Sequence, residues 1–359
     1  MNSRKTPLRA GLIGCGRMGS RYAAALQNTG RIALGGICDP RLGKDRIEQF
    51  ACRAYKDEEA LLCDPRIDVA IIAAPTELHK DLCIRAAERH KHVLVEKPMA
   101  LTLPDARAMI GAAESNGVKL TLGMVERFNP TYRKIKEVMA QSCLGRVISV
   151  SVTRKTKSVN RPAWYLEAGK SGGVIVDLAI HDIDLLLWLL GDEVQTAYAL
   201  SPGRHGDVTD TAMVLLGFRK GAIACLDVSW RLDPSYPSWG EIRMEILGER
   251  GMIAADAGAL PPVYIAGGTS LPSFIHTQED LKWSGIDLVR EDVIRSMLES
   301  FAESIIGDTT VTPDGRDGLK ALEVALHAVE SLERKTPVTI GAKISKEERN
   351  HEGTDSKGI

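Results

Sequence analysis

The first third of the chain alternates short apolar runs with helical segments, and this rhythm restricts its possible folds more than any other feature. The apolar runs, of which Val69 to Ala73 is one, lack regularly spaced polar positions, so both faces of each strand would be buried. Buried strands that alternate with helices predict a parallel sheet covered on both faces. We expect strands at Leu8–Ile13, Ile32–Cys38, Val69–Ala73, Val93–Val95 and Lys119–Gly123, and helices at Met18–Asn28, Arg41–Ala51, Leu78–Arg89 and Pro104–Asn116.

The rhythm changes after about Arg127, where longer strands become frequent. Turns such as Phe218 to Gly221 and Gly248 to Gly251 are typical of antiparallel hairpins. Strands are expected at Val147–Lys157, Val194–Ser201, Thr211–Phe218, Ala222–Trp230, Glu241–Leu247 and Gly251–Asp256, and helices at Pro130–Gln141, Val174–Leu190, Arg290–Ile306 and Arg316–Arg334. The chain is therefore predicted to be an α/β protein, with a doubly wound parallel sheet in residues 1–127 and an α+β domain with a large, mainly antiparallel open sheet in residues 128–342. Residues 343–359 are expected to form a disordered tail.

Composition excludes several classes of function. The 359 residues are 44% apolar and 26% charged with a net charge of −1, so the chain has no basic excess for nucleic-acid binding. Its apolar runs are far shorter than the roughly 20 residues of a membrane-spanning helix, and the polar segment from Met1 to Pro7 argues against a secretory signal. Seven scattered cysteines without a CxxC pair indicate reduced thiols. We expect a soluble, cytoplasmic protein that binds neither nucleic acid nor membranes.

A glycine-rich motif follows the first predicted strand. Gly14, Gly16 and Gly19 match GxGxxG, a helix is expected directly after them, and Asp39 ends the next predicted strand. In such motifs the first glycine permits a tight turn, the second lets the backbone approach a pyrophosphate, and the third allows helix and strand to pack closely. The helix N-terminus presents N–H groups to the phosphates. The motif predicts a dinucleotide-binding Rossmann domain, although a domain that has lost its nucleotide would have the same shape.

Asp39 bears on which dinucleotide would bind. Its carboxylate would accept hydrogen bonds from both hydroxyls of the adenosine ribose and would repel a 2′-phosphate, which favours NAD over NADP. Arg41 could soften this preference, because its guanidinium can bind a 2′-phosphate. We expect NAD.

The turn Glu96-Lys97-Pro98 ends the fourth predicted strand. Ligands of a doubly wound sheet bind at the carboxyl ends of its strands, which is where Lys97 is expected. The proline after it could hold a cis peptide bond. An isolated Lys-Pro would be interpreted as a surface loop, but after a buried strand we predict that Lys97 holds a substrate hydroxyl and stabilises its oxygen as hydride leaves the carbon.

One strongly apolar predicted helix carries a row of ionisable side chains. Asp177, His181 and Asp184 recur at i, i+4 and i+7, so a regular helix would place them on one stripe and Asp182 elsewhere. Such groups, when buried, need an internal network or a ligand. An Asp–His pair that braces the core is one alternative, and a zinc site is another, although His181 is the only imidazole there. We interpret His181 as a general base with Asp177 as its neighbour, and Asp184 as a structural brace.

Three motifs together resemble the Gfo/Idh/MocA family, whose founding members are glucose–fructose oxidoreductase and inositol dehydrogenase. They are Gly14-Cys-Gly16-Arg-Met-Gly19, Glu96-Lys97-Pro98, and Gly172-Gly173 followed by Asp177, His181 and Asp184. The resemblance runs from about Leu8 to Ile340. It implies an N-terminal Rossmann domain, a C-terminal domain whose open sheet often forms homodimers or homotetramers, and oxidation or reduction of a carbinol on a sugar or cyclitol.

The resemblance also implies roles for individual residues. Lys97, Asp177 and His181 match the family's catalytic lysine, acid and imidazole. The residues implied to border the cofactor are Gly14, Gly16, Arg17, Met18, Gly19, Asp39, Ala74, Pro75, Thr76, His79, Glu96, Lys97 and Arg127. Those expected to contact the substrate are Lys97, Asn129, Trp164, Tyr165, Asp177 and His181. No metal site is expected.

Two subgroups of the family share features with this chain. Val125 to Pro130 and Asp177 to Asp184 are similar to UDP-N-acetylglucosamine 3-dehydrogenases, whereas Arg161 to Tyr165 and Ser171 to Gly173 resemble inositol and free-sugar dehydrogenases. The sequence leaves both alternatives open.

The cations and aromatic residues between these motifs bear on whether the substrate is a nucleotide sugar or a free sugar or inositol. A nucleotide sugar needs cations for its diphosphate, and Arg154, Lys155, Lys157 and Arg161 could supply them, but an alternating strand would point only about half of them inward. Trp164 and Tyr165 could instead stack on a bare sugar ring, or could simply pack in the core.

We therefore predict an NAD-dependent dehydrogenase that transfers a hydride between nicotinamide and a secondary hydroxyl of an inositol, a pyranose or a UDP-linked amino sugar. His181 would remove the hydroxyl proton, Lys97 would hold the same oxygen, and Asp177 would orient both. The alternative is a non-catalytic regulator or scaffold that binds a dinucleotide with the same fold.

Overall fold

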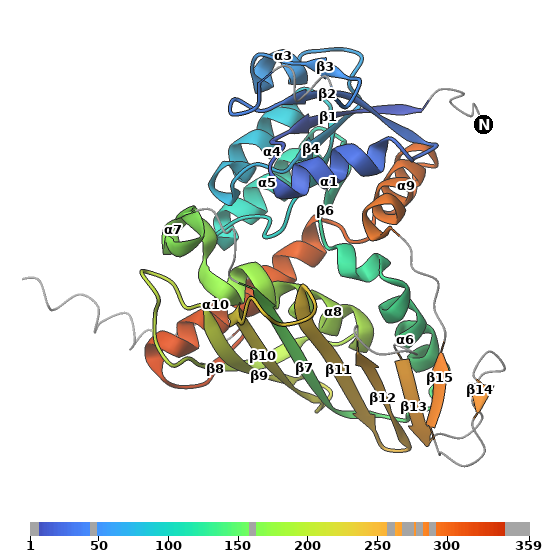
Figure 1. Ribbon diagram of the computed structural model, residues 1–359, viewed down its shortest axis with the longest axis vertical. Helices are drawn as coiled ribbons and strands as arrows, with labels where there is room; N and C mark the ends of the chain where they lie inside the picture. The colour runs from blue at the N-terminus through green and yellow to red at the C-terminus, as the bar shows by residue number, and fades with distance from the viewer. Residues whose placement is uncertain are drawn as a thin grey trace, which may run out of the picture.

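Two sheets, one above the other in Figure 1, organise the molecule. The computed structural model describes residues 7–43, 49–157, 163–256, 263–267, 276–277, 283–286 and 292–341. The predicted tail and Arg161 lie outside these residues, as does the centre of the helix expected at 41–51, whose described ends form turns. No helix within the described ranges is long and apolar enough to cross a membrane, and all seven cysteines carry thiols rather than disulfides.

The first sheet is parallel, as predicted. Its described strands follow the order β3-β2-β1-β4-β5-β6, with the change of direction between β1 and β4 that creates a ligand crevice in doubly wound folds. The elements are β1 Leu8–Ile13, α1 Arg17–Leu26, β2 Ile32–Cys38, β3 Arg53–Ala54, α3 Glu58–Leu62, β4 Val69–Ile72, the 3₁₀ turn η1 Thr76–Leu78, α4 His79–Glu88, β5 His92–Val95, α5 Leu103–Ser115 and β6 Leu120–Leu122.

Helices cover both faces of this sheet because successive strand residues point to opposite sides. Ile71 and Leu94 face one layer, which contains α1, whereas Ile72 and Val95 face the other, which contains α4 and α5. All four side chains are inaccessible to solvent. The continuous apolar runs of the sequence therefore arise from strands that are buried on both sides.

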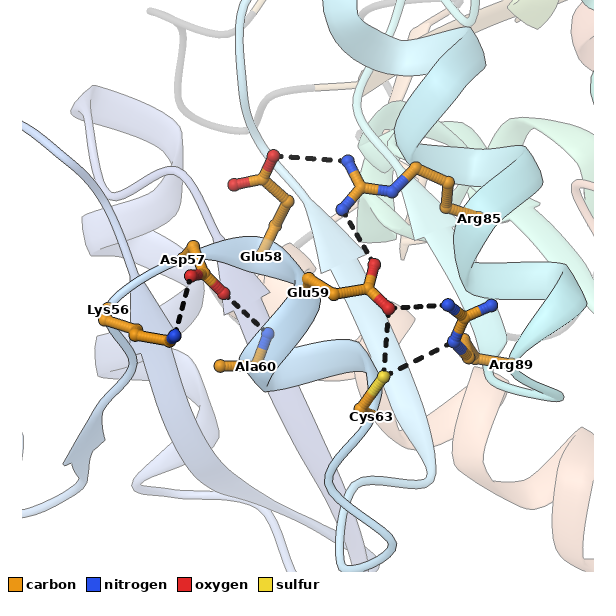
Figure 2. Close-up of polar contacts among 8 residues, drawn as sticks. All are labelled: Lys56, Asp57, Glu58, Glu59, Ala60, Cys63, Arg85 and Arg89. Carbon is orange, nitrogen blue, oxygen red and sulfur yellow. Dashed lines mark hydrogen bonds and ion pairs between the residues drawn. The ribbon is translucent and has the colours of Figure 1, made fainter.

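Helix α3 and strand β3 were not predicted. The N-terminus of α3 is capped by Asp57, whose carboxylate accepts a hydrogen bond from the backbone of Ala60 at 2.7 Å. Ion pairs then tie α3 to α4, as Figure 2 shows: Glu58 and Glu59 bind Arg85, and Glu59 also binds Arg89. These contacts are far apart in sequence, so a local pattern could not indicate them.

The second sheet is mainly antiparallel, also as predicted. Its described strands follow the order β14-β15-β13-β12-β11-β7-β10-β9-β8-β16, and β7 and β10 are its parallel pair. The strands are β7 Val147–Lys157, β8 Val194–Leu200, β9 Thr211–Phe218, β10 Ile223–Leu232, β11 Gly240–Gly248, β12 Gly251–Asp256, β13 Val263–Gly267, β14 His276–Thr277, β15 Trp283–Ile286 and β16 Val338–Thr339.

Helices lie between the two sheets, and none of the described helices covers the far face of the second sheet (Figure 1). They are the short turn η2 Val125–Phe128, α6 Pro130–Ala140, η3 Ala163–Leu166, α7 Ala168–Ser171, the π turn η4 Ile175–Ala179, α8 Ile180–Leu190 and α10 Gly315–Arg334. Burial alternates along β9, where Ala212, Val214 and Leu216 face the helices and Met213 and Leu215 are exposed.

Helix α9, Val293–Ile306, packs against the first sheet, although the domain boundaries predicted from the sequence place it in the second domain. Its buried residues Ile294, Met297, Leu298 and Phe301 recur on one helix face and join the core around Tyr22 of α1. Figure 1 shows α9 beside α1. The first sheet is thus covered by a helix from near the C-terminal end of the described chain.

Candidate active site

The glycine-rich loop has the geometry that a dinucleotide requires. Gly14 has φ +87°, and a Cβ there would lie 2.7 Å from the carbonyl oxygen of Ala73. A Cβ on Gly19 would lie 2.1 Å from the carbonyl oxygen of Gly14, so helix and loop could not pack as they do. Gly16 faces open space, and no described side chain caps the N-terminus of α1. The exposed N–H groups of this turn fit a pyrophosphate.

Asp39 lies at the end of β2, beside this loop. Its carboxylate accepts hydrogen bonds from the backbone N–H of Cys15 at 2.7 Å and from that of Arg41 at 2.8 Å. These bonds fix the carboxylate next to the glycine turn, where the sequence motif places the ribose-binding acid.

His79 joins two of the segments predicted to border the cofactor. One ring nitrogen lies 2.9 Å from the carbonyl oxygen of Ala74, and the other lies 3.0 Å from that of Pro98. The ring is buried, and burial lowers the pKa of His79. Through His79, the loop of Ala74, Pro75 and Thr76 is connected to the Glu96-Lys97-Pro98 turn, whose Lys97–Pro98 bond is cis, as the sequence suggested.

Lys97 and Asp177 meet, although they are 80 positions apart. The Nζ atom of Lys97 donates to Oδ1 of Asp177 at 2.9 Å and to its backbone carbonyl at 2.5 Å. Burial alone would lower the pKa of Lys97, but the Asp177 carboxylate, together with Tyr165 and Glu96, holds it above its ordinary value. Lys97 is therefore an ammonium group at neutral pH.

His181 lies on the first turn of α8, four residues after Asp177. Burial holds the pKa of His181 well below its ordinary value, and the charges of Lys97, Arg154 and Arg17 lower it further. Its Nδ1 atom is buried and has no hydrogen-bond partner among the described residues. The imidazole is consequently neutral at pH 7 and has an unused ring nitrogen.

The helix that carries these groups begins differently from the prediction. Its first turn, η4, is a π turn in which the backbone N–H of Ile180 donates to the carbonyl of Ile175, five residues earlier. Such turns are often found at functional sites. The regular 100° spacing assumed for Asp177, His181 and Asp184 therefore does not hold at the Asp177 end.

Arg127 and Asp184 form a buried ion pair. Two guanidinium nitrogens of Arg127 lie 2.8 and 2.6 Å from the Asp184 carboxylate, and a third lies 3.1 Å from Asp317 at the start of α10. Asp184 is the structural brace that the sequence suggested. The expected place of Arg127 beside the cofactor stays a prediction.

A second buried ion cluster surrounds Arg154 on β7. Its guanidinium binds Asp182 at 2.9 Å and Glu126 at 2.8 Å, and the Arg154 side chain is almost inaccessible. Glu126 also accepts a hydrogen bond from Asn129, whose side chain caps α6. Asn129 thus lies in this cluster, and its predicted contact with a substrate is not tested by these bonds.

Trp164 and Tyr165 form an aromatic cluster with Trp230. The ring centroids of Trp164 and Tyr165 are 4.2 Å apart, and Tyr165 meets Trp230 edge to face at 5.7 Å. Tyr165 is close enough to Lys97 to influence its pKa. The Ser171 hydroxyl donates to the Tyr165 carbonyl at 2.8 Å and accepts from Gly173 at 3.1 Å, which ties the cluster to the segment before Asp177.

The sequence did not indicate Tyr22, which donates a hydrogen bond to the buried Glu96 carboxylate at 2.7 Å. Two surface hollows of about 200 and 310 Å³ lie elsewhere, one lined by Arg9 and Tyr55 and the other by Met139 and Leu189. Neither is lined by Lys97 or His181, so these hollows lie apart from the contact between Lys97 and Asp177.

Comparisons with known proteins identify both halves of the chain. The profile of an oxidoreductase family with an NAD-binding Rossmann fold, GFO/IDH/MocA, matches residues 8–124, and that of the GFO/IDH/MocA C-terminal domain matches residues 132–254. Myo-inositol 2-dehydrogenase of Thermotoga maritima is 30% identical, and the match covers 93% of this chain and 98% of that protein.

Two further similarities extend over nearly the whole chain. The NAD⁺-dependent scyllo-inositol 2-dehydrogenase of Bacillus subtilis is 29% identical over 94% of this chain and 97% of its own length. The crystal structure of GenD2 from gentamicin A biosynthesis, in complex with NAD, is 25% identical, with a TM-score of 0.78 over 94% of this chain and 97% of that one. These matches show that the chain belongs to the GFO/IDH/MocA family of oxidoreductases.

Proposed function

We propose that this protein is an NAD-dependent dehydrogenase that transfers a hydride between nicotinamide and a secondary hydroxyl of a cyclitol or an unmodified sugar. One observation carries the proposal: Lys97, at the carboxyl end of β5, reaches Asp177 of the second domain at 2.9 Å, one turn before the neutral His181. Residues 1–127 would hold the dinucleotide, and residues 128–342 would bind the substrate. The relatives named as inositol 2-dehydrogenases support this class of substrate.

His181, Lys97 and Asp177 would each have a separate role in the reaction. In the oxidative direction, the neutral imidazole of His181 would accept the hydroxyl proton. The Lys97 ammonium would bind the same oxygen and stabilise its developing negative charge, and Asp177 would keep that ammonium in place. Bound NAD would supply the acceptor for the hydride. Lys97 and Asp177 are only 13% and 10% exposed, so their charges would interact more strongly with the oxygen than they would in water.

Two of the four cations considered for a diphosphate are engaged in other contacts, which supports an uncharged substrate over a nucleotide sugar. Arg154 is buried and bound to Asp182 and Glu126, and Lys155 forms an ion pair with Asp227 at 2.6 Å on the opposite side of β7. Neither is available to a diphosphate without breaking these contacts. The aromatic pair of Trp164 and Tyr165 could instead cover a sugar or cyclitol ring.

The cofactor proposed is NAD rather than NADP. The Asp39 carboxylate is held beside the glycine-rich loop by two backbone N–H groups. At that place it would bind the ribose hydroxyls and repel a 2′-phosphate. Arg41, which is exposed, is the residue that could weaken this selectivity.

We also propose that the open face of the second sheet forms a homodimer or homotetramer. Leu200 on β8, Met213 and Leu215 on β9 and Ile223 on β10 are each 49% to 59% exposed. The strand register places Leu200 opposite Met213, and Gly217 opposite Ile223, so these side chains form one continuous apolar patch. A patch of this kind is typical of a protein interface.

A screen of NAD reduction tests the function. Inositols, hexoses and UDP-sugars would each be incubated with NAD while nicotinamide absorbance at 340 nm is followed, and a thermal-shift panel would run in parallel, because a ligand of the folded state raises the melting temperature. We expect reduction with a cyclitol or an unmodified sugar. Dinucleotide binding without reduction by any compound would instead support the non-catalytic regulator, and turnover confined to UDP-sugars would contradict the proposed substrate class.

A further inference from the structure

Tyr22 connects the glycine-rich helix to the turn that carries Lys97. It lies on α1, three residues after Gly19, and its side chain is inaccessible to solvent. Its phenol donates a hydrogen bond of 2.7 Å to Oε1 of Glu96. Neither the glycine motif nor the Glu-Lys-Pro turn, taken alone, indicates that these two segments are joined through a side chain.

The Glu96 carboxylate continues this connection to Lys97. Its second oxygen, Oε2, accepts a hydrogen bond from the backbone N–H of Lys97 at 3.1 Å. The Lys97 side chain then extends to Asp177 in the second domain. Two hydrogen bonds therefore connect α1 through Glu96 to the backbone of Lys97, and the covalent side chain of Lys97 carries the ammonium group from there to Asp177.

Close packing holds the carboxylate in this arrangement. A Cβ on Gly123, just after β6, would lie 3.0 Å from both the Glu96 carboxyl carbon and the Tyr22 hydroxyl oxygen. Burial raises the pKa of Glu96 above its ordinary value, against the opposite effects of Lys97, the Tyr22 hydrogen bond and Arg21. Among the described residues, hydrogen bonds to this carboxyl group come from the Tyr22 hydroxyl and the backbone N–H of Lys97.

We propose that Tyr22 is a positioning residue: its phenol fixes the Glu96 carboxylate, and the carboxylate in turn fixes the backbone from which the Lys97 ammonium reaches the reacting oxygen. This inference rests on the proposed catalytic role of Lys97. Small displacements of a catalytic group lower the rate strongly, because the reacting atoms must be aligned. Loss of the phenol would therefore lower kcat more than it weakens cofactor binding.

A matched tyrosine separates positioning from simple stabilisation. Tyr55, which is also buried in the first domain, donates a hydrogen bond of 2.8 Å to Oδ2 of Asp64, away from Lys97. Tyr22→Phe and Tyr55→Phe each remove one hydroxyl that binds a carboxylate and leave the ring. If both bonds were merely structural, both variants would lower the melting temperature and leave kcat near the wild-type value.

The experiment measures kcat, KM for NAD and melting temperature for the wild type and both variants. We expect Tyr22→Phe to lower kcat about tenfold or more while KM for NAD changes less than about threefold, and Tyr55→Phe to keep kcat within about twofold. Wild-type kcat in Tyr22→Phe would overturn the inference. A wild type that reduces no NAD with any polyol would overturn the proposed function instead.

A second variant keeps the test decisive if Tyr22→Phe does not fold. Gly123→Ala retains both hydrogen-bonding groups but places a methyl group against them. We expect it to lower kcat in the same way, with KM for NAD nearly unchanged. A folded Gly123→Ala enzyme with wild-type kcat would contradict the positioning role.

Discussion

The ammonium nitrogen of Lys97 lies 2.9 Å from a carboxylate oxygen of Asp177, and this ion pair spans the two domains. Lys97 follows β5 of the first sheet, whereas Asp177 lies in the π turn that leads into α8. The backbone carbonyl of Asp177 accepts a second hydrogen bond from the same nitrogen. The pair can therefore form only when the two domains pack together as they do here, which links the fold to the chemistry of Lys97 and Asp177.

The low pKa of His181 predicts how activity depends on pH. A general base is active when it is unprotonated, so kcat/KM should stay level as the pH falls from 8 through 6.5, the ordinary pKa of histidine, and should decline only below it. The check is a pH profile of kcat/KM at saturating NAD. A loss of activity with a midpoint above about 6.5 would show that His181 is not the base or that it is not buried.

Substitution of Asp39 should change cofactor selectivity. Asp39→Ser removes the negative charge that would repel a 2′-phosphate, while Arg41 remains nearby. We expect the ratio of kcat/KM for NAD to that for NADP to fall by about tenfold or more, which corresponds to about 1.4 kcal/mol. Kinetics with both cofactors measure this ratio. An unchanged ratio would show that Asp39 does not bind the adenosine ribose.

The buried and exposed ion pairs should differ in their effect on stability. Arg127→Met leaves Asp184 buried without its cation, which should reduce the free energy of unfolding by about 3–5 kcal/mol. Arg85→Met breaks the exposed pairs with Glu58 and Glu59 in Figure 2 and should cost less than about 1 kcal/mol. Urea unfolding of both variants provides the comparison. Equal losses of unfolding free energy in the two variants would contradict the expectation that the buried ion pair matters more than the exposed ones.

A charge on the open sheet should disrupt the proposed oligomer. Leu215→Glu introduces a carboxylate at the centre of the apolar patch, 49% exposed on β9, where a partner subunit would bury it. Light scattering should show a smaller assembly, whereas Arg107→Glu on the exposed surface of α5 should leave the mass unchanged. If Leu215→Glu keeps the wild-type mass, another surface forms the assembly, or the protein is a monomer.

Local patterns predicted most of the sheets. The strands β7, β9 and β12 have the same bounds as the sequence suggested, because each alternates buried and exposed residues or forms an apolar run between turns. The short elements β3 and α3 were missed. They lack a periodic pattern of their own, and α3 is held by ion pairs to residues about 26 to 30 positions away.

Sequence motifs marked some of the residues that meet, whereas contacts between distant segments have no sequence signal. The Glu-Lys-Pro turn and the Asp–His spacing singled out Lys97 and Asp177, which are in contact, and their catalytic roles stay predictions. The sequence could not indicate that Tyr22 binds Glu96, because the two are 74 positions apart. The π turn was missed as well, because the spacing argument assumes a regular helix throughout.

The most direct test of the central claim compares the wild type with Lys97→Met and His181→Gln in the reduction of NAD by the best polyol substrate. The control is Lys80→Met, a half-buried lysine of α4 that forms an ion pair with Asp105. We predict that Lys97→Met and His181→Gln each lower kcat at least about 100-fold while the protein remains folded and binds NAD, and that the control keeps wild-type activity. Near-normal turnover in both of these variants would show that the two nitrogens do not carry out the reaction.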